Sequence, residues 1–377
     1  MRPIQMVDLK QQYTKIKSEV NSAIQEVLDN ATFINGPAVS EFATALAAYN
    51  GSRHVIPCAN GTDALQISLM ALDLQPGDEV ITPSFTYIAT TEVVALLRLK
   101  PVFVEVDPRT FCMDPVALEK AITPRTRAIV PVHLYGHAAP MEEILQIAGR
   151  HNIPIIEDNA QAIGGHYTFR DGTARKTGAM GTIGCTSFFP SKNLGCYGDG
   201  GAIFTDDDAL ASRLKMIANH GQSRRYYHDL VGCNSRLDSI QAAVLKVKLK
   251  KLDEYIAARR AAADYYDNAF ASHPKIRTPY RAAYSHHVFH QYTLILEGVD
   301  RDGLNTFLAG RNIPSMIYYP VPAHRQQMFA ASGSSYQLAT TDWLTERVIS
   351  LPIHTELDKE QLDTISSAVL EFIDEKN

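Results

Sequence analysis

The strongest constraint on the fold is an alternation of strand-like and helix-like runs between residues 60 and 205. Residues 63–74, DALQISLMALDL, have helical spacing. Short apolar or β-branched runs recur around them: DEVITP (78–83), PVFVEVD (101–107), RAIVPVHL (127–134), IPIIED (153–158), GCTSFF (184–189) and GAIFT (201–205). Continuous apolar strands separated by helices predict an α/β fold with a mostly parallel sheet covered on both faces. Ligands of such sheets bind at the carboxyl ends of the strands, so site residues are expected there.

The remainder of the chain predicts a second, smaller domain. A length of 377 residues exceeds that of a typical single domain. Residues 238–270 predict one long amphipathic helix or two joined ones. The runs HQYTLIL (290–296) and SMIYYP (315–320) then predict strands of an α+β tail. We therefore expect a large domain over 1–246 and a small one over 247–377.

Composition argues against several classes of partner. The chain is 45% hydrophobic and 20% charged, with a net charge of −5, which gives no support for nucleic-acid or anionic-membrane binding. Its first residues hold no apolar segment of signal-peptide length, and no stretch reaches the length of a membrane span. We expect a cytoplasmic protein.

Neither the cysteines nor the histidines predict a metal site. The five cysteines are scattered, and none forms a C-x-x-C pair, so buried free thiols are expected. The run HHVFH (286–290) precedes a strand-like alternation, which would send His287 and His290 to opposite faces. We expect no bound metal.

Three motifs carry chemistry when they are taken together. Asn60, Gly61 and Thr62 precede a helix, where free N–H groups can bind a phosphate, although a plain N-cap by Asn60 or Thr62 is the alternative. Glu157 and Asp158 end a buried strand, either as caps or as site residues.

The third motif is Lys192, which follows SFFPS. Burial disfavours an ammonium, so this side chain either extends to water or has a function that uses the burial. A phosphate site, a carboxylate at a strand end and a buried lysine together suit pyridoxal phosphate. That cofactor needs an anion site, an acid that keeps its ring nitrogen protonated, and a Schiff-base lysine.

The chain resembles the nucleotide-sugar aminotransferases of the DegT/StrS group, which have the type I (aspartate aminotransferase-like) pyridoxal-phosphate fold. The resemblance covers nearly the whole chain. It rests on ordered blocks that include DLKQQY, NGTDAL, GDEVITPSFTYIAT, EDNAQA, SFFPSK, GDGGAIFT, GCNSRLDSIQAA and YYPVPAH. Lys192 stands where some relatives, which are dehydratases, have a histidine, and this favours transamination.

The resemblance implies a role for each of several residues. Lys192 would bind the cofactor covalently, Asp158 would pair with the pyridine nitrogen, and Gln161 would contact the phenolic oxygen. Tyr87 would stack on the ring. The phosphate would be held by Gly61, Thr62 and Ser187, and by Asn234 of a neighbouring subunit, which implies an obligate homodimer with shared active sites. Tyr319 and His324, in YYPVPAH, are expected to bind the substrate, although an alanine precedes His324 where the family has leucine.

Arg236 bears on the substrate because it lies two residues after Asn234. In an extended stretch both side chains would point the same way, so Arg236 would reach the same cleft nearer the sugar. Its guanidinium suits a carboxylate, which it can bind through two hydrogen bonds. The alternative is that Arg236 pairs with Asp238 or caps the following helix.

The resemblance is strongest to the subgroup that aminates UDP-2-acetamido-2-deoxy-3-oxo-glucuronate at carbon 3, on the bacterial route to surface polysaccharides such as O-antigen. A keto nucleotide sugar and L-glutamate as amino donor are therefore the expected substrates. A 4-keto-6-deoxy sugar nucleotide is the alternative. A pyridoxal-phosphate lyase would release pyruvate or sulfide, and a non-catalytic regulator would lack the yellow colour of the cofactor.

Overall fold

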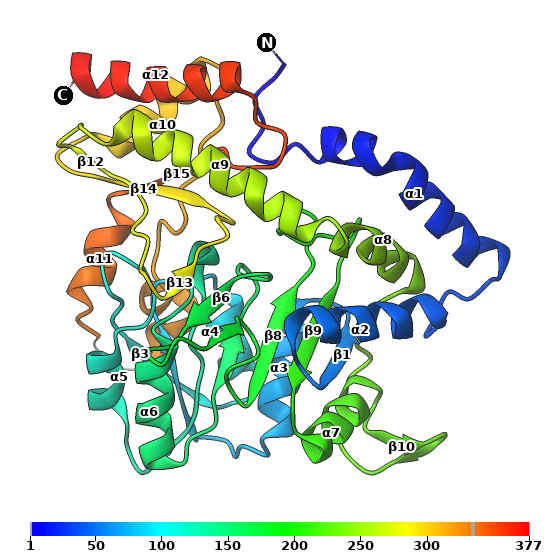
Figure 1. Ribbon diagram of the computed structural model, residues 1–377. Helices are drawn as coiled ribbons and strands as arrows, with labels where there is room; N and C mark the ends of the chain where they lie inside the picture. The colour runs from blue at the N-terminus through cyan, green and yellow to red at the C-terminus, as the bar shows by residue number, and fades with distance from the viewer. Residues whose placement is uncertain (1, 333–335, 377) are drawn as a thin grey trace.

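The computed structural model describes residues 2–332 and 336–376, so residues 1 and 377, which end the two predicted domains, lie outside the described residues. A large unit with a central sheet lies below a smaller unit that holds both ends of the described chain (Figure 1). Within the described ranges, no helix is long and apolar enough to cross a lipid bilayer.

The central sheet is mostly parallel, as the sequence predicts. Its strands are β1 (His54–Cys58), β2 (Glu79–Pro83), β3 (Lys100–Val104), β4 (Thr126–Ile129), β5 (Ile156–Asp158), β8 (Ile183–Ser187) and β9 (Gly201–Thr205). They form the orders β1-β9-β8-β5 and β3-β2-β4. Parallel bridges from Ile129 to Ile155 and from Val132 to Asp158 join the two groups. Strand β9 is antiparallel to both of its neighbours, β1 and β8, and the other strand pairs of the sheet are parallel.

Helices cover both faces of this sheet. They are α2 (Pro37–Asn50), α3 (Gly61–Ala71), α4 (Ala89–Leu96), α5 (Pro115–Ala121), α6 (Met141–His151) and α7 (Asp208–Ala218). The first helix, α1 (Leu9–Asp29), packs instead against Val244 and Val247. One hydrophobic cluster packs α3, α4 and α7 against the sheet, and two others pack α2, α5 and α6 against its opposite face. Burial on both faces explains why the strands lack polar alternation.

The region from 238 to 270 forms two joined helices, α8 (Ser239–Leu249) and α9 (Leu252–Phe270), one of the two predicted arrangements. The small unit packs α9, α10 (Arg301–Gly310) and α12 (Lys359–Lys376) on β12 (Ile276–Arg277), β14 (Tyr292–Leu296) and β15 (Val348–Leu351). Ile4, near the start of the chain, joins this core. The domain boundary at 246 stays a prediction.

The sequence prediction for SMIYYP (315–320) is wrong. This segment forms no strand and makes a single bridge, from Met316 to Ser350. Its apolar side chains Ile317, Tyr318 and Tyr319 pack instead against a cluster that contains Phe85 and Tyr135 of the large unit. Contact between the units thus accounts for the apolar run. The HHVFH run is also not a strand beyond β13 (Ser285–His286).

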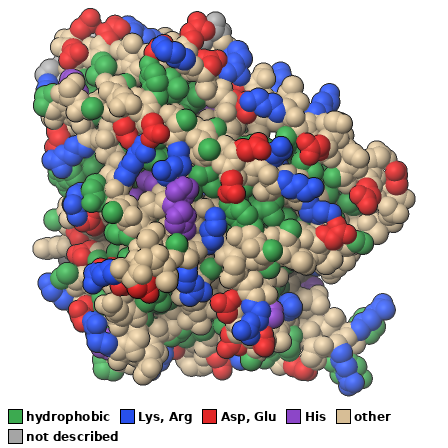
Figure 2. Space-filling view, viewed as in Figure 1, with side chains coloured by type: hydrophobic (Ala, Val, Ile, Leu, Met, Phe, Trp, Pro, Cys, Tyr) green, Lys and Arg blue, Asp and Glu red, His purple; other side chains and the backbone are tan. Residues whose placement is uncertain are grey.

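Two small antiparallel elements complete the large unit. The strand β6 (His166–Thr168) pairs with β13 on one side and with β7 (Ala174–Lys176) on the other. A hairpin of β10 (Gln222–Arg224) and β11 (Tyr227–His228) projects from the large unit (Figure 1). Lys and Arg side chains gather at this projection (Figure 2), and Arg224 and Arg225 belong to it.

The buried carboxylate of Glu157 ties β5 to the segment before β8. Glu157 is fully buried and accepts hydrogen bonds from the backbone N–H groups of Gly178 (2.8 Å), Met180 (2.6 Å) and Gly181 (2.5 Å). His133 Nε2 lies 2.8 Å from Glu157 Oε2. This acid is therefore structural.

We expect Glu157→Gln to destabilise the fold. The new amide N–H₂ group would face N–H donors, and leaving such buried donors unsatisfied costs about 1–3 kcal/mol each. Urea unfolding should show a loss of a few kcal/mol relative to wild type. The control is the neighbouring isosteric change Asp158→Asn, which should leave the unfolding free energy nearly unchanged. Equal stabilities of Glu157→Gln and wild type would contradict this assignment.

Candidate active site

A cavity of about 850 Å³ lies at the carboxyl ends of β5 and β8. Eight of the sequence-predicted site residues line it: Gly61, Thr62, Tyr87, Asp158, Gln161, Ser187, Lys192 and Tyr319. They come from segments that are up to 258 residues apart in the sequence, between Gly61 and Tyr319. The fold therefore brings together most of the residues selected from the sequence.

Lys192 lies in the loop after β8 and contributes to the cavity wall. Its backbone N–H donates to Phe189 O at 2.8 Å, which closes a turn and fixes where the side chain starts. Desolvation lowers the pKa of Lys192 to about 8, against the opposing effect of the Asp158 carboxylate. An amine with this pKa is about one-tenth unprotonated at pH 7, a far larger fraction than for an ordinary lysine, and this fraction can act as a nucleophile.

Asp158 is the last residue of β5 and is 6% exposed. Thr90 Oγ1 donates to its Oδ2 at 2.8 Å, and the N–H of Ala160 donates to its Oδ1 at 3.1 Å. These two bonds fix the orientation of the carboxylate. The side chain faces the cavity, whereas Glu157, one residue earlier, points to the other side of the strand, as strand alternation requires.

The start of α3 forms an anion site in the cavity wall. Asn60 caps the helix, and its Oδ1 accepts from the N–H of Asp63 at 2.8 Å. The N–H groups of Gly61 and Thr62 have no acceptor within the helix and carry the positive end of its dipole. A Cβ at Gly61 would lie 2.7 Å from the Ser187 Cβ, so only glycine lets these segments approach so closely. The Asn60 cap therefore leaves the N–H groups of Gly61 and Thr62 available to an anion in the cavity.

Gln161 is held by both ends of its amide. Its Oε1 accepts from the N–H of Tyr135 at 2.6 Å, and its Nε2 donates to the Tyr319 hydroxyl at 3.1 Å. Tyr87 is 57% exposed, and its ring centroid lies 6.1 Å from that of Tyr319. An exposed aromatic ring at a cavity wall can cover a planar ligand.

Asn234, Arg236 and His324 do not belong to the cavity lining. Asn234 is exposed, and its Oδ1 accepts from Arg236 Nε at 2.8 Å. The two side chains thus lie together, and the hydrogen-bond partner of Arg236 is Asn234 rather than Asp238. His324 is held by Ser84, 2.7 Å from its Nδ1. The functional roles predicted for these three residues stay predictions.

Sequence reasoning missed Thr90, Tyr135 and His290. Thr90 lies three residues after Tyr87, and this spacing at the start of a helix is the signal that could have linked it to the site. Tyr135 acts through its backbone N–H, for which no side-chain motif exists. The HHVFH run raised only the question of a metal ligand at His290, yet this residue lines the cavity with Lys192.

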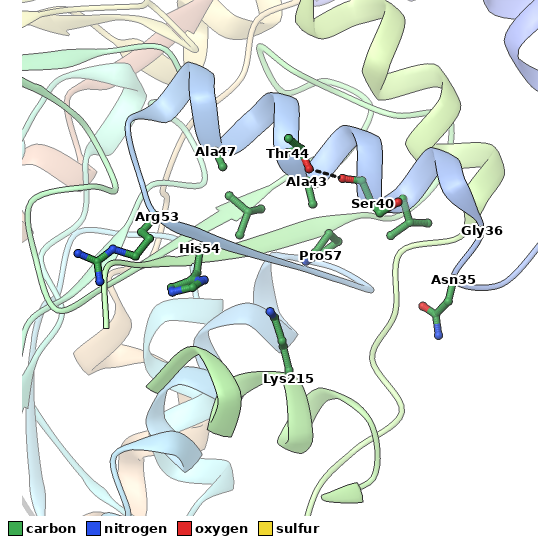
Figure 3. A pocket seen from close by; sticks show the side chains of 12 residues that line it. Asn35, Gly36, Ser40, Ala43, Thr44, Ala47, Arg53, His54, Pro57 and Lys215 are labelled. Atoms are coloured by element: carbon green, nitrogen blue, oxygen red, sulfur yellow. Dashed lines mark hydrogen bonds between the residues drawn. The ribbon is translucent and has the colours of Figure 1, made fainter. Parts of the chain in front are cut away.

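A second cavity, of about 400 Å³, lies between α2, β1 and the last turn of α7. Lys215 extends from α7 toward the space beneath α2, where Ala43 and Ala47 face it (Figure 3). No residue selected from the sequence as a site residue lines this cavity. Its described lining contains Lys215 but no Asp or Glu, so it lacks the pairing of an acid with a lysine found in the larger cavity.

The larger cavity fits pyridoxal phosphate. Its helix start and Ser187 suit the phosphate, its hydrogen-bonded carboxylate suits a protonated pyridine nitrogen, and its desolvated lysine suits the aldehyde. The described residues contain no group of three or more His, Cys, Asp or Glu side chains placed to hold a metal ion.

We expect Asp158→Asn to lower kcat for amino-group transfer by at least about a hundredfold, the scale seen when a key electrostatic partner is lost. The amide is neutral and cannot hold a proton on the ring nitrogen. Steady-state kinetics at saturating cofactor would measure the effect, with circular dichroism and urea unfolding as controls for the fold. Wild-type kinetics in this variant would show that another acid serves the nitrogen.

Comparison with known proteins agrees with this geometry. Residues 14–370 match the DegT/DnrJ/EryC1/StrS aminotransferase family. The chain is 46% identical to the UDP-2-acetamido-2-deoxy-3-oxo-D-glucuronate aminotransferase of Pseudomonas aeruginosa, over 97% of this chain and 99% of that protein. It is 43% identical to the UDP-N-acetyl-3-dehydro-alpha-D-glucosamine 3-aminotransferase of Acidithiobacillus ferrooxidans, over 97% of each chain.

A solved structure shows the same fold. The crystal structure of Streptomyces venezuelae DesV, in complex with a ketimine intermediate, superposes with a TM-score of 0.95 at 40% identity and full coverage of both chains. The predicted fold class is confirmed. This chain belongs to the DegT/DnrJ/EryC1/StrS aminotransferase family.

Proposed function

We propose that this protein transfers an amino group from L-glutamate to carbon 3 of a UDP-linked 3-keto uronic acid, with pyridoxal phosphate as its cofactor. The observation that carries the proposal is the presence of Lys192, Asp158 and the start of α3 in one cavity. The proposed setting is a cytoplasmic step of bacterial surface polysaccharide synthesis, such as that of the O-antigen of lipopolysaccharide.

When bound, pyridoxal phosphate supplies an aldehyde that takes up amines and a ring that withdraws electrons from the carbon that loses a proton. The residues of this chain do the rest. Asp158 keeps a proton on the ring nitrogen, because a carboxylate next to it favours the charged form. Lys192 provides the attachment point and, once released, moves the proton between the reacting carbons. Tyr87 covers the ring.

The charges of the cavity support a shared active site. Among the described residues of its lining, Lys192 is the one Lys or Arg, whereas Asp63, Asp158 and Asp199 contribute carboxylates. A nucleotide diphosphate that carries a uronic acid is strongly anionic, so further cations are needed to bind it. We propose that Asn234 and Arg236 of a second copy provide polar groups there, in a homodimer.

The exposed side chains before Asn234 fit this arrangement. Tyr226 is 77% exposed and Val231 is 85% exposed, which is costly for large apolar side chains unless a partner covers them. They lie in the segment that carries the projecting hairpin (Figure 1). A second copy placed against this segment would receive Asn234 and Arg236 near its own cavity.

The two relatives compared above differ at the sugar, since one name specifies a uronate and the other a glucosamine. Arg236 favours the uronate for this chain, because a guanidinium binds a carboxylate through two hydrogen bonds and gains less from a hydroxyl. The alternative, a 4-keto-6-deoxy sugar nucleotide, has no carboxylate for it.

We expect wild type to prefer the UDP-linked 3-keto uronate over a 3-keto glucosamine and over a 4-keto-6-deoxy sugar nucleotide. Arg236→Ala should raise KM for the uronate by roughly tenfold or more, since hydrogen bonds to charged groups contribute about 1.5–3 kcal/mol. Arg150→Ala, an exposed arginine of α6 that belongs neither to the cavity lining nor to the hairpin, is the matched control. Mass spectrometry of the amino-sugar product formed with L-glutamate would measure the substrate preference of wild type and the KM of each variant. Preference for a sugar without the carboxylate would overturn the uronate proposal.

A mixed dimer tests the shared site. Lys192→Ala and Asn234→Ala are each expected to be nearly inactive alone. After subunit exchange, one site of the mixed dimer receives Lys192 from one chain and Asn234 from the other, so partial activity should return. No recovery, with exchange demonstrated by native mass spectrometry, would rule out a site shared in this way.

A further inference from the structure

Two threonines form a hydrogen-bonded chain that ends on the Asp158 carboxylate. Thr86 Oγ1 lies 3.2 Å from Thr90 Oγ1, and Thr90 Oγ1 donates to Asp158 Oδ2 at 2.8 Å. Both threonines are buried, with Thr86 4% and Thr90 1% exposed. Thr86 and Asp158 line the cavity, whereas Thr90 lies outside its lining. The chain therefore leaves the cavity wall at Thr86, passes behind it through Thr90, and returns to it at the acid.

Thr90 uses its hydroxyl differently from several other helical threonines of this structure. A threonine inside a helix commonly donates to a carbonyl three or four residues earlier. Thr91, the next residue of α4, does this, since its Oγ1 donates to Ile88 O at 3.0 Å. The same kind of local bond is made by Thr14, Thr44, Thr306 and Thr364. The Thr90 hydroxyl instead donates to a side chain 68 positions away in the sequence, so its bond orients the acid.

The number of protons fixes the direction of this chain. A threonine hydroxyl carries one proton, and an ionised carboxylate only accepts. Because Thr90 gives its proton to Asp158, its oxygen accepts in the contact with Thr86, and the Thr86 hydroxyl is the donor there. Each hydrogen bond of such a chain polarises the next one, which strengthens the bond that reaches the acid.

We propose that Thr86 and Thr90 are positioning residues, which hold the Asp158 carboxylate in the direction that the ring nitrogen of the cofactor requires. The inference rests on the proposed function, in which Asp158 keeps a proton on that nitrogen. The terminal torsion of an aspartate has a broad preference, so its partners decide where the carboxylate points. Thr90 holds Oδ2, and the N–H of Ala160 holds Oδ1 at 3.1 Å. A ring N–H that enters the cavity thus meets a carboxylate that is already oriented.

The test uses two non-covalent ligands that differ only at the ring nitrogen. Pyridoxamine phosphate has no aldehyde, so it binds without a bond to Lys192, and in 1-deazapyridoxamine phosphate a C–H replaces the ring nitrogen. Isothermal titration calorimetry of cofactor-free protein gives both dissociation constants, and their ratio reports the interaction of Asp158 with the nitrogen. We expect wild type to bind pyridoxamine phosphate about thirtyfold more tightly, the scale of one hydrogen bond to a charged group.

Thr90→Val keeps the shape of the side chain and removes the hydroxyl. We expect this variant to reduce the affinity ratio about tenfold, because the carboxylate is no longer held toward the nitrogen. Thr90→Ser should restore the wild-type ratio, since serine supplies the same donor. Thr91→Val is the matched control, because Thr91 is also buried on α4 but its hydroxyl bonds to the backbone of Ile88. The ratio of this control should equal that of wild type.

Urea unfolding checks that each variant is folded. If Thr90→Val does not fold, Thr86→Val takes its place, because it removes only the first bond of the chain. This variant should lower the affinity ratio in the same direction by a smaller factor, about two- to threefold.

An unchanged affinity ratio in Thr90→Val, or an equal loss in the Thr91→Val control, would overturn the proposal. These outcomes differ from a failure of the proposed function. If wild type bound neither compound, the cofactor assignment would be wrong, and the inference would fall with it. If wild type bound both compounds equally, the pairing of Asp158 with the ring nitrogen would be wrong, although the cavity would still bind the cofactor.

Discussion

The parallel pairing of β5 with β8 is the constraint on which the candidate active site depends. Asp158 lies opposite Cys185, so the chain beyond Cys185 reaches Ser187 and then the Lys192 loop at the same edge of the sheet. The acid, the start of α3 and the lysine converge there because parallel strands end together. A slip of one residue in this register would turn Asp158 away from the cavity and Glu157 into it.

Two adjacent carboxylates thus have opposite roles. The bonds of Glu157 are made within the protein, to three backbone N–H groups and His133. The bonds of Asp158, from Thr90 and Ala160, orient the carboxylate but leave it facing the cavity. This division lets one short strand stabilise the fold with one acid and serve a ligand with the next.

Local pattern was sufficient for much of the fold and of the site. The runs at 78–83 and 201–205 are strands β2 and β9, and the helix after Asn60 is α3, because burial on both faces leaves a strong apolar signal. The motif alone leaves open whether Glu157 and Asp158 are caps or site residues, and the strand geometry shows that Asp158 faces the cavity whereas Glu157 bonds to buried backbone.

Other features depend on contacts that no local pattern records. The apolar run SMIYYP has the composition of a strand, but its aromatic side chains are partly buried against a cluster that joins the two units. His290 is predicted to lie in a strand because it begins the apolar run HQYTLIL, but β14 starts at Tyr292 and His290 lines the cavity. Asn234 and Arg236 lie outside the cavity of their own chain, so a single sequence or a single subunit does not reveal what they touch.

The central claim is that the cavity, and not burial alone, selects the lysine that holds the cofactor. Lys248 provides the internal comparison, since burial also lowers its pKa to about 8, yet it donates to Gly195 O and does not line the cavity. The most direct measurement is borohydride reduction of the protein loaded with pyridoxal phosphate, followed by peptide mass mapping. We predict that the mass added by the reduced cofactor is found on Lys192 alone. Label on Lys248, or on any other lysine in place of Lys192, would contradict it.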